Sequence, residues 1–352
     1  MRARVDRLRA RLDALEAGAF LVLGGTNVRY LTGFRSSNAA LLVDRERTLL
    51  VTDGRYAEAA RAVEDVELLL ADRHLAFELG QRLAELTGGP VAFEADHVTY
   101  ADHQRIAACG LELKPAEKEV ERLRAVKDAP ELDAIRRSAA LLDEAFARLA
   151  QERLVGRTEL EVARWLERLL REELGAEGLS FDPIVGGGPN GALPHHHPGE
   201  RPIGANELVV VDAGCVVDGY CSDCTRTFAT GPLDDELARA YETCRQVQAD
   251  ALAQVRAGAV CADLDLAVRE ALGAAGYEVL HGLGHGVGLE IHEEPRLAKT
   301  SKDTLVAGNV VTVEPGVYLA GRGGVRVEDL VIVTGGGAEV LSPFRKDLVT
   351  VS

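Results

Sequence analysis

The first third of the chain alternates short apolar runs with segments of helical periodicity. The apolar runs between Ala19 and Ala116 read AFLVL, AALLV, TLLVTD, VELLLAD, PVAFEAD and LELKPA. Segments such as RYAEAARAVED and AFELGQRLAEL lie between them and carry apolar residues at helical spacing. Short strands that alternate with helices are typical of an α/β domain. Before them, MRARVDRLRARLDALEAG predicts an amphipathic helix that ends at Gly18.

A long charged stretch follows this region. From Glu117 it reads EKEVERLRAVKDAPELDAIRRSAALLDEAFARLAQERL, a helical pattern with Pro130 at the first turn of a second helix. The change in pattern predicts a domain boundary near Leu123. We therefore expect an N-terminal α/β domain over residues 1–122 and a second domain over residues 123–352.

The second domain shows the same order of elements twice. Two helical patterns, the second opened by the capping-box spacing of Thr158 to Glu161, precede a hairpin at 208–228. Two more helical patterns, near 233–257 and 262–274, precede a hairpin at about 309–334. This repetition suggests an ancient duplication and predicts a pseudo-twofold α+β domain.

Composition and charge narrow the classes of function. A chain of 352 residues exceeds what one hydrophobic core usually organises, which supports two domains. The net charge of -16 would repel a phosphate backbone, so nucleic acid is not an expected partner. No apolar run is long enough to span a membrane or to form a signal core, so we expect a cytoplasmic protein. The six cysteines are then expected as reduced thiols.

Two pairs of acidic residues lie inside the apolar strands of the hairpins. Around the turn signal at Val217 to Gly219, Asp212 and Asp223 are predicted to face each other to within one residue of register. Around the turn at 320–324, Glu314 and Glu328 are predicted to do the same.

These carboxylates need compensation, because an ionised carboxylate is costly to bury without a cation. Pairing with arginines such as Arg226 or Arg326 is one solution. Two divalent cations would balance all four negative charges, whereas one would balance only two. The charge of the four carboxylates therefore favours a dinuclear metal site over a single ion.

A histidine motif adds a nitrogen ligand to this set. In HGLGHGVGLEIHEEPR, His285 lies among glycines that allow close backbone approach, and His292 follows it. A lone histidine is more often a core residue than a ligand, but four strand carboxylates favour the metal interpretation here. An oxygen-rich set with one imidazole suits Mn, Co, Fe or Zn and differs from the thiolate sites of structural zinc.

These motifs resemble the methionine aminopeptidase, aminopeptidase P and prolidase group of metallopeptidases, whose catalytic domain has the pita-bread fold. The resemblance spans nearly the whole chain, through VVVDAG, CSDCTRTF, GHGVGLEIHEEP, VTVEPG and GVRVEDL. It implies the five metal ligands Asp212, Asp223, His285, Glu314 and Glu328.

The N-terminal segments TNVRYLTGF and DGRY resemble the extra domain of the prolidase and aminopeptidase P branch, which methionine aminopeptidases lack. The resemblance therefore implies a hydrolase for the Xaa-Pro bond that uses two divalent metal ions and acts on small peptides with proline at the second position. It also implies a homodimer.

The resemblance implies roles for further residues. Glu314 would shuttle the proton from water to the proline nitrogen, while His195 and His292 would hydrogen-bond the substrate. Arg326 would orient a ligand carboxylate. The alternatives without a functional role are that the HHH run around His195 is a solvated loop and that Arg326 is an outward-facing strand residue.

Substrate length depends on one residue. Arg296, in HEEPR, occupies the place where some prolidases hold an arginine that binds the free carboxylate of a dipeptide. This favours an Xaa-Pro dipeptidase, although a surface ion pair would explain the same residue. An Xaa-Pro aminopeptidase that acts on longer peptides is the alternative. A metal-free binding protein and a creatinase-like enzyme share the fold, but the five retained ligands argue against both.

The cysteines within VVVDAGCVVDGYCSDC have a separate interpretation. The spacing of Cys221 and Cys224 would indicate zinc or redox chemistry if a second such motif were present, and none is. We expect Cys215, Cys221 and Cys224 to fill apolar space around the strands. Asp218 is assigned to the turn.

Overall fold

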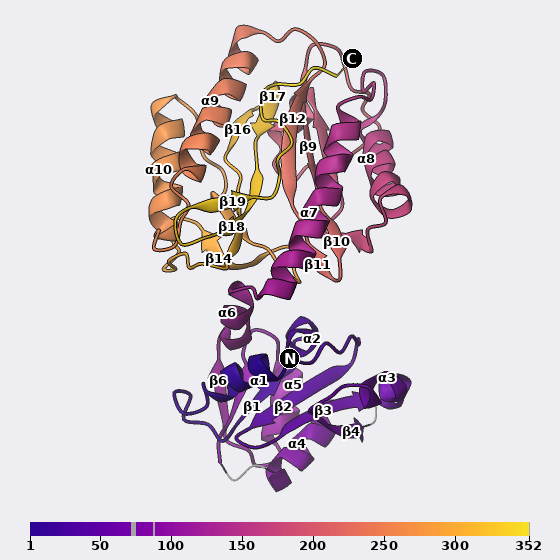
Figure 1. The fold of residues 1–352 in the computed structure, drawn as a ribbon, viewed down its shortest axis with the longest axis vertical. Helices are drawn as coiled ribbons and strands as arrows, with labels where there is room; N and C mark the ends of the chain where they lie inside the picture. The colour runs from indigo at the N-terminus through magenta and orange to yellow at the C-terminus, as the bar shows by residue number, and fades with distance from the viewer. Residues whose placement is uncertain (72–74, 87–88, 352) are drawn as a thin grey trace. The chain divides into compact units, whose positions relative to one another are not determined.

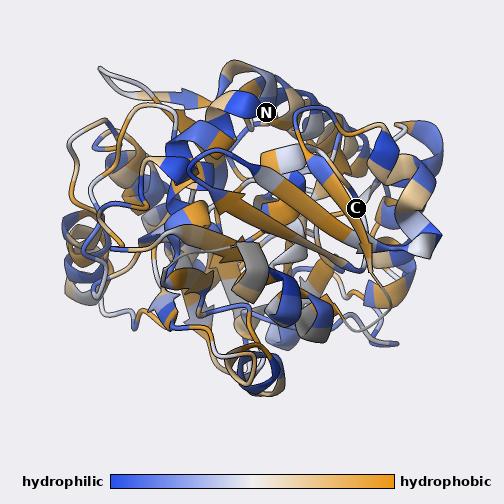
Figure 2. Cartoon of the chain, turned by 90° about the horizontal axis from the view of Figure 1, so that it is seen from below, coloured by the Kyte–Doolittle hydropathy of each residue, from blue (hydrophilic) through white to orange (hydrophobic). Residues whose placement is uncertain are grey.

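The computed structural model describes residues 1–71, 75–86 and 89–351. The chain forms two compact units, Met1–Arg124 and Ala125–Ser352 (Figure 1). The strands that are visible in Figure 2 are predominantly hydrophobic, whereas most helices carry hydrophilic and hydrophobic segments. No helix among the described residues is both long enough and apolar enough to cross a membrane.

The first unit is built on one six-stranded sheet, in the order β4-β3-β2-β1-β5-β6. The strands, β1 (Ala19–Val22), β2 (Ala39–Asp44), β3 (Thr48–Asp53), β4 (Glu67–Ala71), β5 (Val91–Glu94) and β6 (Leu113–Ala116), fall on the six predicted apolar runs. The helices are α1 (Arg2–Arg9), α2 (Gly25–Thr32), α3 (Ala57–Arg61), α4 (Leu75–Leu86), α5 (Tyr100–Ala107) and α6 (Glu119–Ala125). This confirms an α/β unit.

The N-terminal helix is shorter than predicted. It ends at Arg9, and the amides of Arg11 and Leu12 bond three residues back, to Leu8 O at 2.9 Å and to Arg9 O at 3.1 Å. Glu16 then adopts a positive φ of 49°, which an α-helix does not allow. The amphipathic pattern therefore continues through turns instead of a helix.

Four helices flank the strands of the second unit: α7 (Ala129–Leu149), α8 (Glu159–Arg168), α9 (Asp235–Leu252) and α10 (Cys261–Ala274). The predicted starts are confirmed: Pro130 lies in the first turn of α7, and Thr158 forms a capping box with Glu161 at α8. Figure 1 shows α9 and α10 on one side of the strands and α7 and α8 on the other.

The strands of this unit form antiparallel groups. One sheet has the order β12-β9-β8 and another β11-β10-β7, with β7 (Gly178–Leu179), β8 (Ile184–Gly187), β9 (Leu208–Ala213), β10 (Cys215–Val217), β11 (Tyr220–Cys221) and β12 (Cys224–Ala229). The sheet β14-β13-β15-β18-β19 and the pair β16-β17 comprise β13 (Gly284–Gly286), β14 (Glu293–Leu297), β15 (Val310–Val313), β16 (Gly316–Leu319), β17 (Gly323–Arg326), β18 (Asp329–Val333) and β19 (Ala338–Val340).

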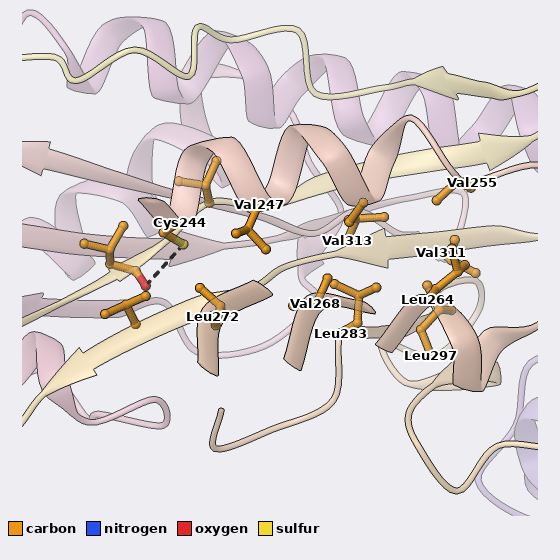
Figure 3. Packing of buried hydrophobic residues seen from close by; sticks show 14 of the residues in the cluster. Cys244, Val247, Val255, Leu264, Val268, Leu272, Leu283, Leu297, Val311 and Val313 are labelled. Atoms are coloured by element: carbon orange, nitrogen blue, oxygen red, sulfur yellow. Dashed lines mark hydrogen bonds between the residues drawn. The ribbon is translucent and has the colours of Figure 1, made fainter. Parts of the chain in front are cut away.

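Each helix pair has its own apolar core. Residues of α7 and α8 pack with β8, β9 and β12. Residues of α9 and α10 form a second core with strands of the second half of this unit, β14 to β18. Figure 3 shows part of the second core, in which the labelled residues are Cys244, Val247, Val255, Leu264, Val268, Leu272, Leu283, Leu297, Val311 and Val313. Burying a side chain such as Leu272 contributes about 1.5 to 3 kcal/mol. The predicted repetition of helix pair and hairpin is thus present in the fold.

Candidate metal centre and substrate pocket

The first hairpin carries Asp212 on β9. Its arms pair Val217 with Tyr220, so Asp218 and Gly219 form the turn, with φ of 50° and 82°. Positive φ at both central residues is the geometry of a type I′ turn, which confirms the assignment of Asp218.

The register of this hairpin differs from the prediction. Asp212 is paired with Thr225, and Asp223 lies two positions further toward the turn. The prediction was wrong because it placed the centre of the turn one residue too early. Since side chains alternate along a strand, positions two apart share a face, so Asp212 and Asp223 still reach the same site, from diagonal positions.

The second hairpin has the predicted register. Val313 pairs with Asp329 at the end of β15, and Gly316 pairs with Arg326 in β16 and β17. The register does not change between these pairs, so Glu314 lies opposite Glu328 in the short break between the strands. The prediction for this pair of carboxylates is confirmed.

The two hairpins and β13 bring the five predicted ligands together. One oxygen each of Asp212, Asp223 and Glu328 lie within 4.8 Å of one another. His285 Nε2 lies 3.3 Å from Glu314 Oε1 and 3.5 Å from Asp223 Oδ2.

Glycines on both sides of His285 permit this close approach. A Cβ at Gly284 would lie 2.1 Å from Thr312 O, and one at Gly286 would lie 2.3 Å from Glu294 O. Any side chain at these positions would therefore push β13 away from its neighbours, and His285 with it.

The site fits divalent cations, because two of its buried carboxylate oxygens receive no hydrogen bond from the protein. Asp212 Oδ1 and Glu328 Oε1 are buried and have no hydrogen-bond partner. Burial, followed by the charges of neighbouring carboxylates, raises the pKa of Asp223 and of Glu328 well above the usual range. Positive charge is thus missing where hard oxygen ligands converge, which is the environment that Mn, Co, Fe or Zn ions would complete.

Arg326 supplies part of the compensation. Its Nη2 donates to Asp212 Oδ2 at 2.6 Å, and its Nε donates to Thr225 Oγ1 at 2.9 Å. Thr225 Oγ1 in turn donates to Glu328 Oε2 at 2.7 Å. Arg226, the other candidate counter-ion, donates instead to Asp329 at 3.0 Å. Arg326 therefore faces the site, bonded directly to Asp212 and linked to Glu328 through Thr225, and it does not point outward.

A pocket of about 470 Å³ opens onto this centre. Its lining includes all of the predicted substrate-binding residues, His195, His292 and Arg296. The apolar part of the lining consists of Phe181, Ile184, Pro194, Ile291 and Ala298. The pocket thus combines cationic and hydrogen-bonding groups with apolar walls, as a small amphipathic ligand requires.

Two residues of the pocket network were not predicted from the sequence. His281 lines the pocket, and its Nε2 lies 2.8 Å from the hydroxyl of Tyr318, which accepts a hydrogen bond from Arg326 Nη1 at 3.1 Å. Burial lowers the pKa of His281. Its position beside glycine in HGLGH is a signal that could have indicated it, whereas Tyr318 becomes apparent only in the fold.

The HHH run also differs in part from its solvated-loop interpretation. His195 and His197 are exposed, but His196 Nε2 lies 2.8 Å from Glu159 Oε2, and the side chain of Glu159 is fully buried. His196 therefore belongs to a buried hydrogen-bond network, which local sequence could not reveal.

A second acidic group, Glu94, His97 and Glu121, lies in the first unit. Here the oxygens are occupied by protein donors: Glu94 Oε2 accepts from the amides of Leu23 and Gly24, both at 2.7 Å, and its Oε1 accepts from Asn27 at 2.7 Å. Such a network needs no ion, in contrast to the centre in the second unit.

The cysteines of the first hairpin are free and buried, as predicted. Cys224 is 2% exposed and packs in the core of α7 and α8, and burial raises the pKa of Cys221 to about 11. Their thiols therefore behave as apolar groups at neutral pH.

The fold and the site together define a metal-dependent hydrolase with an α/β N-terminal unit and a duplicated α+β catalytic unit. The chain belongs to metallopeptidase family M24, whose model matches residues 133–335, and the creatinase/prolidase N-terminal domain matches residues 4–126. The architecture is that of the prolidase and aminopeptidase P branch, which confirms the predicted fold and the predicted class of enzyme.

Three relatives illustrate the similarity. The probable dipeptidase PepE of Mycobacterium tuberculosis is 34% identical over 97% of this chain and 94% of that protein. The structure of an Xaa-Pro dipeptidase from Bacillus anthracis matches with a TM-score of 0.94 and 34% identity over 99% of both chains. The X-Pro aminopeptidase from Thermotoga maritima matches with a TM-score of 0.88 and 31% identity over 99% of this chain and 100% of that one.

Proposed function

We propose that this protein is a hydrolase with two divalent metal ions that cleaves the Xaa-Pro bond of small peptides. The observation that carries the proposal is the convergence of four carboxylates of the two hairpins and His285 on one pocket, with Asp212 Oδ1 and Glu328 Oε1 unpaired. Asp212, Asp223, His285, Glu314 and Glu328 would hold Mn, Co, Zn or Fe. Bound there, the ions would polarise the substrate carbonyl and acidify water.

The chain's own residues then handle protons and charge. The proline nitrogen of the scissile bond must be protonated before it can leave. Burial would raise the pKa of Glu314, but the hydrogen bond and charge of His285 lower it to about 2, so Glu314 is ionised at neutral pH. In the proposal it takes up the proton that the attacking water loses. It then passes this proton to the proline nitrogen, while His195 and His292 hydrogen-bond the oxygen that gains charge.

The favoured activity is that of a dipeptidase, which releases free proline. Arg296 supports it, because its exposed guanidinium lines the pocket and the described residues place no ion-pair partner on it. A free guanidinium matches the carboxylate of a dipeptide's proline. The Bacillus anthracis relative, whose name is Xaa-Pro dipeptidase, has the same fold along its whole length.

The second candidate is an Xaa-Pro aminopeptidase that removes the first residue of longer peptides. The Thermotoga maritima relative, named X-Pro aminopeptidase, supports it with nearly the same coverage. The exposed position of His292 and Arg296 at the pocket is compatible with a longer chain that leaves the pocket on that side.

A peptide panel with added Mn, Co, Zn or Fe tests both candidates. We expect cleavage of Ala-Pro and Leu-Pro, with no cleavage of the matched peptides Ala-Ala and Leu-Ala. Trimming of Xaa-Pro-Xaa peptides without dipeptide cleavage would overturn the dipeptidase assignment in favour of the aminopeptidase. Equal cleavage of Leu-Pro and Leu-Ala would overturn the Xaa-Pro specificity.

A homodimer in the cytoplasm completes the proposal. Light scattering coupled to gel filtration tests the dimer, and a mass equal to one chain would contradict it. Cell fractionation tests the compartment.

A further inference from the structure

The first residue of α8, Glu159, has a fully buried carboxylate enclosed by a single loop. Its Oε1 accepts from the backbone N–H of Gly187 and from the side-chain amide of Asn190, both at 2.9 Å. Its Oε2 lies 2.8 Å from His196 Nε2 and accepts from the N–H of Gly199 at 3.4 Å. One carboxylate therefore binds the last residue of β8 and three points of the segment that follows it toward β9.

This segment carries His195, and both neighbours of His195 are anchored. On one side the carbonyl oxygen of Pro194 accepts from Arg326 Nη1 at 3.3 Å, which links the loop to the candidate metal centre. On the other side His196 is bound to Glu159. The exposed imidazole of His195 lines the pocket. Its place in the pocket thus depends on two contacts made by adjacent residues.

The part of the loop that leads back to the sheet is hydrogen-bonded to the N-terminal end of α8. Leu160 N donates to Gly199 O at 3.0 Å, and Glu159 N donates to Arg201 O at 3.1 Å. The negative charge of Glu159 is also favourable in the first turn of α8, where the helix presents its positive end. A buried carboxylate is costly without such donors, so the loop and the helix end stabilise each other.

We propose that Glu159 is a positioning residue that holds the loop in the conformation in which His195 faces the substrate. Glu159 does not line the pocket, so it acts through His195 and not on the substrate itself. This inference rests on the proposed function for the role of His195, but the effect of Glu159 on the loop is independent of it.

The first experiment compares Glu159→Gln with Glu161→Gln in the full chain. Glu161 belongs to the same helix end and caps Thr158 N at 2.8 Å, outside the loop around His195. We expect the kcat of Glu159→Gln on Leu-Pro to fall about tenfold to a hundredfold, with unchanged metal content and little change in KM, and Glu161→Gln to match the wild type. Equal kcat values for both variants would overturn the proposal.

Hydrogen exchange provides a measurement that does not depend on activity. In Glu159→Gln, the amides of residues 186–199 should exchange faster than in the wild type, whereas those of α8 beyond Leu160, which do not donate to the loop, should not. If the wild type cleaves no Xaa-Pro peptide, the proposed function fails, and this measurement still decides the role of Glu159. Unchanged exchange over 186–199 would overturn that role. If Glu159→Gln does not fold, His196→Gln, which removes one contact, is measured in the same way.

A double-mutant cycle tests whether Glu159 acts through His195. In the background His195→Ala, the further change Glu159→Gln should cost less than about twofold, because the residue that it positions is already absent. The same fold loss in both backgrounds would show that the two residues act independently, and the proposal would be wrong.

Discussion

The guanidinium of Arg326 donates a 2.6 Å hydrogen bond to the carboxylate of Asp212 and so joins the two hairpins that carry the candidate metal ligands. Both side chains are nearly buried, with 4% and 11% of their surface exposed. Because Arg326 lies on the second hairpin and Asp212 on the first, this contact fixes the halves of the duplicated unit against each other at the site.

This contact predicts that Arg326→Lys weakens metal binding. A lysine cannot reach Asp212, Thr225 and Tyr318 together, because its single ammonium replaces a planar group with several donors. We expect the metal affinity, measured by calorimetric titration, to fall about tenfold to a hundredfold. Arg322→Lys is the matched control, since Arg322 lies at the tip of the same hairpin and pairs with Asp234. Equal affinities of the two variants would contradict the assignment of Arg326.

Removal of Glu314 as a proton carrier should abolish most turnover. Glu314→Gln keeps the size of the side chain but cannot accept the proton, so kcat on Ala-Pro should fall by about 10² to 10⁴. The control is Glu339→Gln, which alters an exposed pair with Arg136. A Glu314→Gln enzyme with wild-type kcat, measured by proline release, would remove Glu314 from its proposed role.

Chelation should destabilise the protein because the buried carboxylates then lack counter-ions. A hundredfold excess of metal over its Kd stabilises the folded state by about 2.7 kcal/mol, which corresponds to about 5–11 °C in the Tm of a unit of the size of Ala125–Ser352, which carries the site. In the double variant Asp223→Asn, Glu328→Gln, both buried charges are absent. We expect its metal-free form to melt above the metal-free wild type and to show no shift with metal. A shift as large as that of the wild type would place the metal elsewhere.

The fold and the candidate ligands could be predicted from the sequence because their signals are local. Apolar runs, Pro130 in the first turn of α7, the cap at Thr158 and the Asp218-Gly219 turn each act within a few residues of the chain. The prediction of the register of the first hairpin was wrong because it relied on one local signal, the position of the turn. A shift of one residue in the centre of the turn moves the partner of Asp212 by two positions.

The hydrogen bonds that hold the candidate site residues in place could not be predicted, because the residues that make them meet only in the folded chain. Glu159 looks like an ordinary first-turn residue, yet it binds a loop that ends forty residues later at Gly199. Tyr318 similarly meets His281 and Arg326 through strand pairing and not through spacing. Sequence thus indicated the candidate ligands and substrate-binding residues, while the residues that hold them in place required the structure.

Burial predicts that the cysteines of the second unit are unreactive. It raises the pKa of Cys221 to about 11 and that of Cys244 to about 12, so few thiolates form at a pH of about 8. Cys109, which belongs to the first unit, is partly exposed and is therefore expected to react. Titration with a disulfide reagent at this pH should label one thiol of the native chain rapidly, none in Cys109→Ser, and all six of the wild type in denaturant. Rapid labelling of Cys221 or Cys224 would revive a redox role for that pair.

Arg296 provides the sharpest test of substrate length. If its guanidinium binds the free carboxylate of a dipeptide, then Arg296→Ala should raise KM for Leu-Pro about tenfold or more and leave kcat nearly unchanged, because the lost contact is equal in ground and transition states. KM for Leu-Pro-amide, which lacks the carboxylate, should not change. Lys299→Ala, an exposed cation outside the pocket lining, is the control for general charge effects. Equal changes in KM for Leu-Pro and its amide would show that Arg296 does not recognise the carboxylate, and the preference for dipeptides would lose its structural basis.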